Sequence, residues 1–179
     1  MAKLLLGKEV TEALNAELKT RTAALRARGI IPTLAIIRLG DDPSDLSYER
    51  GALKRADAVG VAVRQFILPR EAAAEEVLAV LDQINADDTI HGVLLFRPLP
   101  KHLNERRICE ALSPAKDVDG MTPGSLTGIF TGTHEGFAPC TSDACVKILE
   151  YWGVISQNAA AIIAKAQIER IEIIICILL

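Results

Sequence analysis

The sequence predicts an α/β fold in which one three-layer domain is built around a parallel sheet. Three strand-like apolar runs alternate with helix-like segments over residues 1–150. Strands that are separated by helices pair in parallel, because the helix returns the chain to the end of the sheet at which the previous strand began. Half of the 179 residues are hydrophobic and 24% are charged, which is enough core for one ordinary domain and part of a second.

The first predicted elements begin and end at residues that are typical of helix boundaries. Apolar residues at helical spacing indicate a helix from Val10 to Arg28, which Gly29 ends. The mostly apolar run Thr33–Leu39 is typical of a buried strand. Pro43-Ser44 then opens a helix that reaches Val59 and is closed by Gly60.

The later elements repeat this order. Val61–Leu68 alternates as a strand, and the Ala-, Glu- and Leu-rich segment Ala72–Ala86 favours a helix. Gly92–Phe96 is a third strand, which is followed by a Pro-rich loop. Asn104–Leu112 and Ser142–Trp152 are predicted to be short helices.

Residues 155–179 differ from the rest of the chain. They are mostly Ile and Ala, contain no Gly or Pro, and end on the apolar run Ile173–Leu179. The segment therefore lacks the residues that usually form a turn, and no other segment is evident against which its apolar end would pack. We expect a truncated chain or a region whose residue identities are uncertain.

Composition excludes several classes of function. The net charge of −3 and the absence of a basic stripe argue against nucleic acid as a partner. No C-x-x-C pair occurs among the four cysteines (Cys109, Cys140, Cys145 and Cys176), so we expect no metal site and reduced, intracellular thiols. The apolar run at the N-terminus is too short for a signal peptide, and no window approaches the length of a membrane span. These features predict a cytoplasmic protein.

One acidic residue stands where an α/β fold meets its ligands. Asp119 lies in the segment Lys116–Thr122, which follows the strand Gly92–Phe96 and precedes the run Gly136–Thr141. A carboxylate near the carboxyl ends of parallel strands can accept two parallel N–H bonds from the edge of an amidine-like ring. The alternative from spacing alone is a solvated aspartate in a turn.

Four short motifs in order carry a family resemblance. They are Gly40-Asp41-Asp42-Pro43-Ser44 leading to Ser47-Tyr48, then Pro98-Leu99-Pro100, Lys116-Asp117-Val118-Asp119-Gly120, and Pro139-Cys140-Thr141. Over roughly residues 3–154 the chain resembles the bifunctional methylenetetrahydrofolate dehydrogenase/cyclohydrolase family, in its divergent, clostridial-like branch. The resemblance implies a folate-binding catalytic domain over 1–150 and the incomplete start of a Rossmann-like, dinucleotide-binding domain over 151–179. It also implies a homodimer.

The resemblance assigns roles to matching residues. Tyr48 corresponds to the tyrosine that stacks on folate, with a half-buried core tyrosine as the alternative. Asp119 corresponds to the carboxylate that pairs with the pterin ring, and Pro98 and Pro100 to the prolines that shape the floor of the site. The expected substrate-binding residues are Tyr48, Phe96, Arg97, Pro98, Pro100 and Asp119.

The chain departs from the family pattern at two positions. Ala52 replaces the lysine four residues after Tyr48, and Phe96 replaces the glutamine before the Pro-Leu-Pro motif. Lys54 is the nearest lysine, roughly 120° away around the helix from Tyr48. We therefore expect Tyr48, Lys54 and Asp119 to be the catalytic residues, with Lys54 or Arg97 as the substitute base or electrostatic group.

The expected reaction is oxidation of 5,10-methylenetetrahydrofolate by hydride transfer to NADP or NAD, with cyclohydrolase activity doubtful. Residues 164–172, where the dinucleotide loop should fall, lack its glycines, so no cofactor-binding residue is assigned. Two alternatives stay open: a non-catalytic folate-binding or interaction domain, and a Rossmann-like regulatory module without folate.

Overall fold

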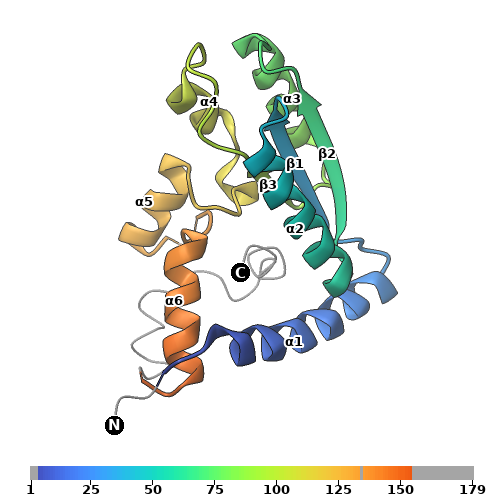
Figure 1. Cartoon of the computed structure of the whole chain (residues 1–179), viewed down its shortest axis with the longest axis vertical. Helices are drawn as coiled ribbons and strands as arrows, with labels where there is room; N and C mark the ends of the chain where they lie inside the picture. Colours follow the sequence, from blue (N-terminus) through green and yellow to red (C-terminus); the bar gives the residue numbers. More distant parts are fainter. Residues whose placement is uncertain (1–3, 134, 155–179) are drawn as a thin grey trace.

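The computed structural model describes residues 4–133 and 135–154, and its centre is a parallel sheet of three strands (Figure 1). The strands are β1 (Thr33–Leu39), β2 (Ala62–Leu68) and β3 (Gly92–Leu95), in the order β2-β1-β3. β1 pairs with β2 along its whole length and with the shorter β3 from Leu34 to Ile37. The predicted α/β class with a parallel sheet is confirmed.

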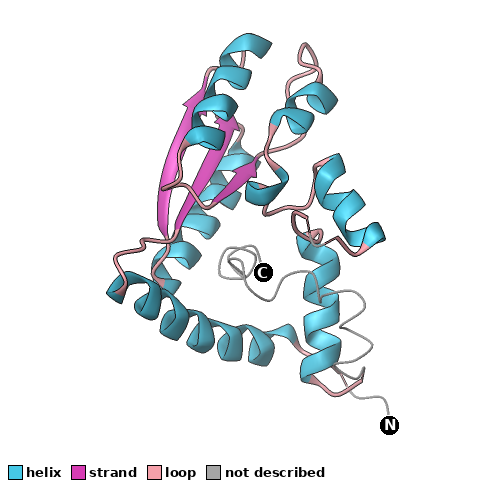
Figure 2. Cartoon of the chain, turned by 180° about the vertical axis from the view of Figure 1, so that it is seen from behind, coloured by secondary structure: helices cyan, strands magenta, loops and turns pink. Residues whose placement is uncertain are grey.

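Helices cover both faces of the sheet (Figures 1 and 2). Alternate residues of β1 point to opposite faces, as the pleat of a strand requires. Leu34 and Ile36 join a buried cluster with residues of α1 (Gly7–Ala27) and α2 (Pro43–Val59). The intervening residues Ala35, Ile37 and Leu39 join a second cluster, on the side of α3 (Ala74–Ala86) and α4 (Glu105–Ala111). The domain therefore has the three layers that the sequence predicts.

β1 and α2 have the predicted bounds because their ends are specified locally. The Asp42 side chain accepts a hydrogen bond from the backbone N–H of Ser44 at 2.9 Å, and Pro43 occupies the first turn of α2. Gly60 ends the helix in the left-handed conformation, with φ of 79°. Other boundaries are shifted. α1 begins three residues before the predicted start, and β2, α3 and α4 begin one or two residues later than predicted.

Two elements between β3 and the last helix were not predicted. They are the 3-10 turn η1 (Pro114–Lys116) and the helix α5 (Pro123–Thr131). The hydroxyl of Thr122 caps α5 by accepting a hydrogen bond from the N–H of Ser125 at 3.1 Å. The glycines inside this helix resemble loop residues in the sequence, but Gly128 lies so close to the backbone of Glu135 that a Cβ would meet its carbonyl oxygen at 2.0 Å.

The last described helix, α6 (Cys140–Tyr151), begins two residues before the predicted start and lies beside the start of α1 in both views (Figures 1 and 2). The predicted start of a Rossmann-like domain and the unusual run over 155–179 lie almost wholly outside the described residues. Within residues 4–133 and 135–154, no helix is long and apolar enough to cross a membrane.

Candidate functional site

A cleft of about 340 Å³ opens beside the carboxyl end of β3. Its volume lies at the lower end of the range for small-molecule sites, and its position is the one where open α/β sheets bind ligands. Three structural units line the cleft: the first turns of α2, the end of β3 with the residues after it, and the loop before α5. The lining residues are Ser44, Asp45, Tyr48, Leu94, Leu95, Phe96, Arg97 and Asp119.

Tyr48 is held at the cleft by an aromatic contact. Its ring meets the ring of Phe96 edge to face, with centroids 5.4 Å apart and planes at 63°. Phe96 is buried, whereas Tyr48 keeps 49% of its surface exposed, so the tyrosine ring is fixed on one side and open to a ligand on another. Burial and the charge of Asp119 raise the pKa of the Tyr48 hydroxyl, and the guanidinium of Arg55 opposes this rise.

Asp119 is paired with Arg97, the first residue after Phe96. Arg97 Nη2 lies 3.4 Å from Asp119 Oδ2, and Arg97 Nη1 lies 3.8 Å from Glu105 Oε1. Glu105 is itself fixed, because its other oxygen accepts the backbone N–H of Leu99 at 2.8 Å. Burial raises the pKa of the Asp119 carboxyl, and Arg97 counteracts this by favouring the ionised form. About a third of the Asp119 side chain remains exposed, so its oxygens can accept further N–H bonds.

The loop that carries Asp119 is organised by the fully buried Asp117. Its carboxylate accepts hydrogen bonds from the backbone N–H groups of Met121 and Thr122 and from the Ser125 hydroxyl. Gly120 follows Asp119 with φ of 62°, and a Cβ there would lie 2.6 Å from the backbone nitrogen of Pro139. The sequence Asp-Val-Asp-Gly is therefore required in part by the shape of this loop.

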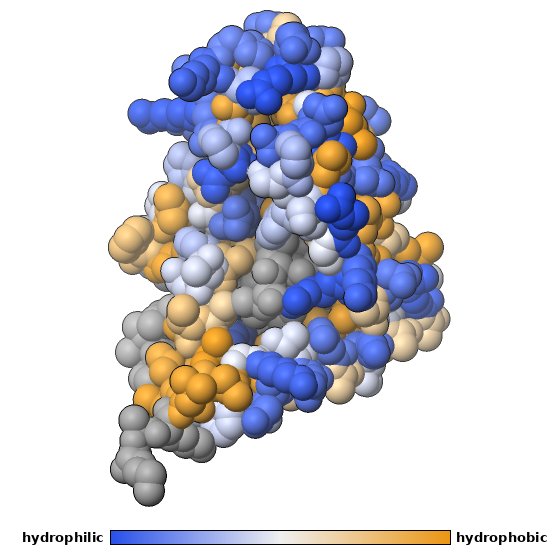
Figure 3. Space-filling model, in the orientation of Figure 1, coloured by the Kyte–Doolittle hydropathy of each residue, from blue (hydrophilic) through white to orange (hydrophobic). Residues whose placement is uncertain are grey.

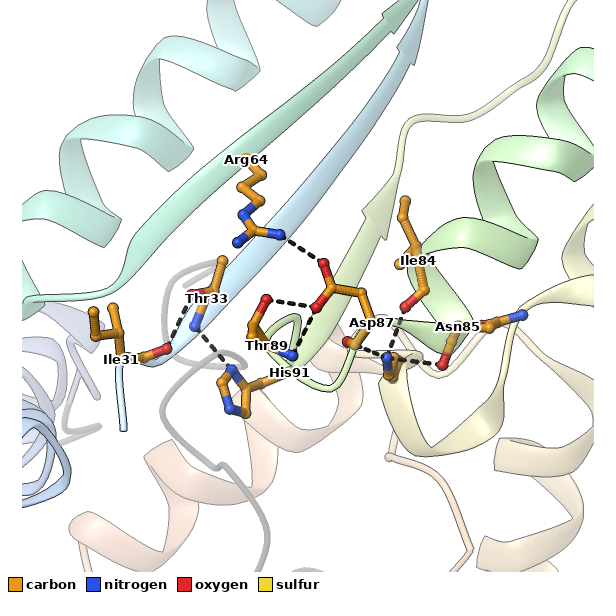
Figure 4. A network of polar contacts seen from close by, with 9 residues as sticks. Ile31, Thr33, Arg64, Ile84, Asn85, Asp87, Thr89 and His91 are labelled. Atoms are coloured by element: carbon orange, nitrogen blue, oxygen red, sulfur yellow. Dashed lines mark hydrogen bonds and ion pairs between the residues drawn. The ribbon is translucent and has the colours of Figure 1, made fainter. Parts of the chain in front are cut away.

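The segment is also anchored at its start, at the end of α3. The ammonium of Lys116 donates hydrogen bonds to the backbone oxygens of Ile84, Asn85 and Asp87 at 2.7, 3.0 and 2.8 Å. Figure 4 shows this network, in which the Asp87 side chain also accepts hydrogen bonds from other side chains. A cation that satisfies the last carbonyls of a helix stabilises that end. Lys116 thus fixes the chain just before Asp117.

Four of the predicted site residues meet at the cleft: Tyr48, Phe96, Arg97 and Asp119. Pro98 is exposed and Pro100 is half-buried, and neither residue lines the cleft. The peptide bond between Arg97 and Pro98 is cis. Lys54 is exposed and is likewise absent from the lining. The catalytic role of Lys54 and the floor role of the two prolines stay predictions.

Two charged residues of α2 near the site were missed by sequence reasoning. Glu49 is buried, and its carboxylate accepts hydrogen bonds from Arg38 Nε at 2.9 Å and Gln65 Nε2 at 2.6 Å. The ion pair with Arg38 fixes α2 to β1, and the hydrogen bond from Gln65 fixes it to β2, one residue after Tyr48. The second residue is Arg55, whose Nη1 atom is buried and has no hydrogen-bond partner among the described residues. The lone arginine within the apolar run of β1 was the one sequence signal for a buried acid.

Among the described residues, no three His, Cys, Asp or Glu side chains stand together as a metal site. The nearby Cys140 is buried, and its thiol donates a hydrogen bond to the backbone oxygen of Val118 at 2.9 Å. Burial raises the pKa of this thiol far above its ordinary value, so Cys140 is a neutral packing group at the base of the loop.

Comparison with known proteins agrees with this geometry. The sequence profile of "Tetrahydrofolate dehydrogenase/cyclohydrolase, catalytic domain" matches residues 5–119. The chain is 42% identical over 163 residues to "Bifunctional protein FolD" of Carboxydothermus hydrogenoformans, covering 91% of this chain and 57% of that protein. It is 40% identical over 154 residues to the protein of the same name in Clostridium botulinum (strain Hall), covering 86% of this chain and 55% of the relative.

A solved structure shows the same arrangement. The bifunctional FolD enzyme of Campylobacter jejuni superposes with a TM-score of 0.82 at 32% identity, over 85% of this chain and 54% of that one. The chain thus spans little more than half the length of the proteins it matches. Both the profile match and these similarities place it in one family. The chain belongs to the tetrahydrofolate dehydrogenase/cyclohydrolase family, of which it carries the catalytic domain.

Proposed function

We propose that the protein containing this chain oxidises 5,10-methylenetetrahydrofolate to methenyltetrahydrofolate by transferring a hydride to NADP or NAD. The observation that carries the proposal is that Tyr48 and Asp119, which are 71 positions apart in the sequence, line one cleft at the carboxyl end of β3. Membership of the family supports it, as do its relatives with a bifunctional name.

The cleft suits a flat heterocycle that carries N–H donors on one edge. Asp119, kept ionised by Arg97, can accept two parallel N–H bonds from the pterin ring, while Tyr48 lies against its face. Phe96 supports Tyr48 from below and supplies apolar surface. Orientation of this kind fixes the bridging carbon of the substrate relative to the rest of the active site.

Oxidation makes few demands on acid–base groups. The hydride leaves a carbon whose resulting cation is stabilised by two neighbouring nitrogens, so no protein base removes a proton. NADP or NAD supplies the hydride acceptor. The part of the chain expected to contact it, residues 164–172, lies outside the described residues. One relative, the Trypanosoma brucei enzyme, is described with NADP as its cofactor.

Hydrolysis of the methenyl product is more demanding, because protons must move as the ring opens. The two family positions that serve it hold Ala52 and Phe96, and both side chains belong to one buried apolar cluster. The polar pair of the family pattern is thus replaced by two apolar residues that pack in the same region. A positioned proton-transfer group contributes about 10²- to 10⁴-fold to such a step. We therefore propose that hydrolysis is weaker than oxidation.

Steady-state assays of the intact protein test the proposal. NADP- or NAD-dependent oxidation of methylenetetrahydrofolate should be lost in Asp119→Asn and retained in Asp82→Asn, an exposed carboxylate on α3 that serves as the matched control. Hydrolysis of methenyltetrahydrofolate should be slow beside oxidation. Oxidation that survives Asp119→Asn unchanged would overturn the assignment.

A non-catalytic folate-binding or interaction domain is the alternative that the sequence leaves open. Folate binding without any oxidation would support that alternative. Failure to bind folate would instead favour the other alternative from the sequence, a Rossmann-like regulatory module without folate. A homodimer and a cytoplasmic location stay predictions from the resemblance and the composition.

A further inference from the structure

One guanidinium in the cleft is shared between two carboxylates. Arg97 Nη2 lies 3.4 Å from Asp119 Oδ2, and Arg97 Nη1 lies 3.8 Å from Glu105 Oε1. An arginine that faces a single carboxylate often forms a fork of two parallel N–H···O bonds at about 2.7–2.9 Å. Here the two terminal nitrogens face different acids over longer distances. Arg97 is therefore held between its two partners and does not close onto Asp119.

Glu105 is the anchored member of this group. It is the first residue of α4, and its Oε2 atom accepts the backbone N–H of Leu99 at 2.8 Å. The Leu99 side chain is buried in the apolar cluster on the α3 and α4 side of the sheet, so Glu105 is tied to a fixed part of the fold. Arg97 and Asp119 are among the described residues that line the cleft, whereas Glu105 is not. Glu105 thus reaches the site through Arg97.

The position of Arg97 matters because a pterin ring and an arginine fork would use the same atoms of Asp119. In either arrangement two parallel N–H donors meet the two oxygens of the carboxylate. The hydrogen bond from Arg97 reaches Oδ2 alone, and about a third of the Asp119 side chain remains exposed. An Arg97 that closed onto both oxygens would compete with the substrate. At its observed distance it places a positive charge beside Asp119 and leaves room for the ring.

We propose that Glu105 is a positioning residue that acts through Arg97 and keeps Asp119 open to the substrate. Its carboxylate attracts Arg97 Nη1, which limits Arg97 to one long contact with Asp119. The inference rests on the proposed function, because the pterin ring is the ligand that takes the two oxygens of Asp119. It adds to that function a residue of α4 that touches no reacting atom.

The effect on binding should be moderate because all three side chains are partly solvated. Arg97, Glu105 and Asp119 keep 36%, 39% and 33% of their side-chain surface exposed. Hydrophilic side chains also dominate the molecular surface over α4 (Figure 3). Ion pairs in such surroundings change an equilibrium by no more than about fivefold.

Glu105→Gln removes the charge and keeps the shape of the side chain. The amide oxygen of glutamine can still accept the N–H of Leu99, while its NH₂ group no longer attracts Arg97. Calorimetry on the intact protein should show tetrahydrofolate bound about three- to fivefold more weakly. The KM of oxidation should rise by a similar factor, and kcat should stay within about twofold. Glu110→Gln is the matched control and should leave both values in place, because Glu110 is an exposed acid of the same helix that pairs with Arg106.

A double-mutant cycle separates positioning from a structural role. In the Arg97→Met background no guanidinium is left to be released, so Glu105→Gln should change the affinity by less than about 1.5-fold. A loss of the same size with and without Arg97 would show that Glu105 acts through Leu99 and the local fold. That result would overturn the inference.

A measurement without ligand keeps the inference separate from the proposed function. In Glu105→Gln the released Arg97 closes onto Asp119, so the pKa of the Asp119 carboxyl, followed by carbon NMR, should fall below that of the parent. The fall should nearly disappear in the Arg97→Met background. The other ionisable groups around this carboxyl are the same in all these proteins: Asp117, Cys140 and Tyr48.

The two outcomes of this titration have different meanings. A pKa of Asp119 that does not change in Glu105→Gln would overturn the role of Glu105, even in an active enzyme. A pKa that falls in a protein that binds no folate would overturn the proposed function but not the coupling of Glu105 to Asp119 through Arg97.

Discussion

Replacing Asp117 with asparagine removes the charge that organises the loop of Asp119. The buried carboxylate accepts hydrogen bonds from Met121 N at 3.1 Å, Thr122 N at 2.7 Å and the Ser125 hydroxyl at 2.7 Å. Hydrogen bonds to a charged group contribute about 1.5–3 kcal/mol each. Asparagine has the same size, but only its single oxygen can accept, and its NH₂ group would then face the N–H of Met121. We expect the free energy of unfolding to fall by about 2–4 kcal/mol.

Urea denaturation followed by circular dichroism measures this loss. Asp82→Asn, an exposed carboxylate on α3, is the control and should stay within about 0.5 kcal/mol of the parent. Because Asp119 lies two residues further on, Asp117→Asn should also weaken folate binding at temperatures where the protein remains folded. A variant as stable as the control would refute the view that Asp117 holds this loop through its charge.

Three further predictions concern the same region. Burial raises the pKa of Asp119 above the ordinary 3.8, so folate binding should weaken as pH falls toward the raised pKa. In the free protein the ionised carboxylate disfavours folding above the raised pKa, and this loss of stability disappears as pH falls through that pKa. Calorimetry from pH ~7 to ~4 checks this, and constant affinity would contradict it. Gly120→Ala should cost about 2 kcal/mol or more because its Cβ meets backbone, whereas Gly29→Ala, also at positive φ but in open space, should cost about 1 kcal/mol; equal losses in urea would count against the close approach. Alkylation near pH 8 should label the exposed Cys145 well before the buried Cys140, and the reverse order in peptide mass analysis would refute the assigned burial.

The sequence predicts best those features whose cause is local. The Pro43 start and Gly60 end of α2 place its bounds, and the mostly apolar run of β1 identifies a strand that is buried on both faces. The meeting of Tyr48 and Asp119 could be predicted because both lie near the carboxyl ends of parallel strands, where an α/β sheet brings distant segments together.

Features that depend on distant contacts could not be predicted in this way. Glu49 looks like a solvated helix residue, but Arg38 and Gln65 on two different strands bury it. Helix α5 contains glycines that allow close contacts with other parts of the chain, and the low helix propensity of glycine argues against a helix there. The burial of Arg55 Nη1, away from any acceptor in the described part of the chain, likewise follows from its three-dimensional surroundings and not from its place in the sequence.

The central claim is that this cleft binds the pterin ring through Asp119. Calorimetric titration with tetrahydrofolate, comparing the parent with Asp119→Asn, tests it most directly. Losing the charge from a pair of hydrogen bonds should cost about 2–4 kcal/mol, which corresponds to an affinity roughly 30- to 1,000-fold weaker. Equal affinity in the two proteins would contradict the claim.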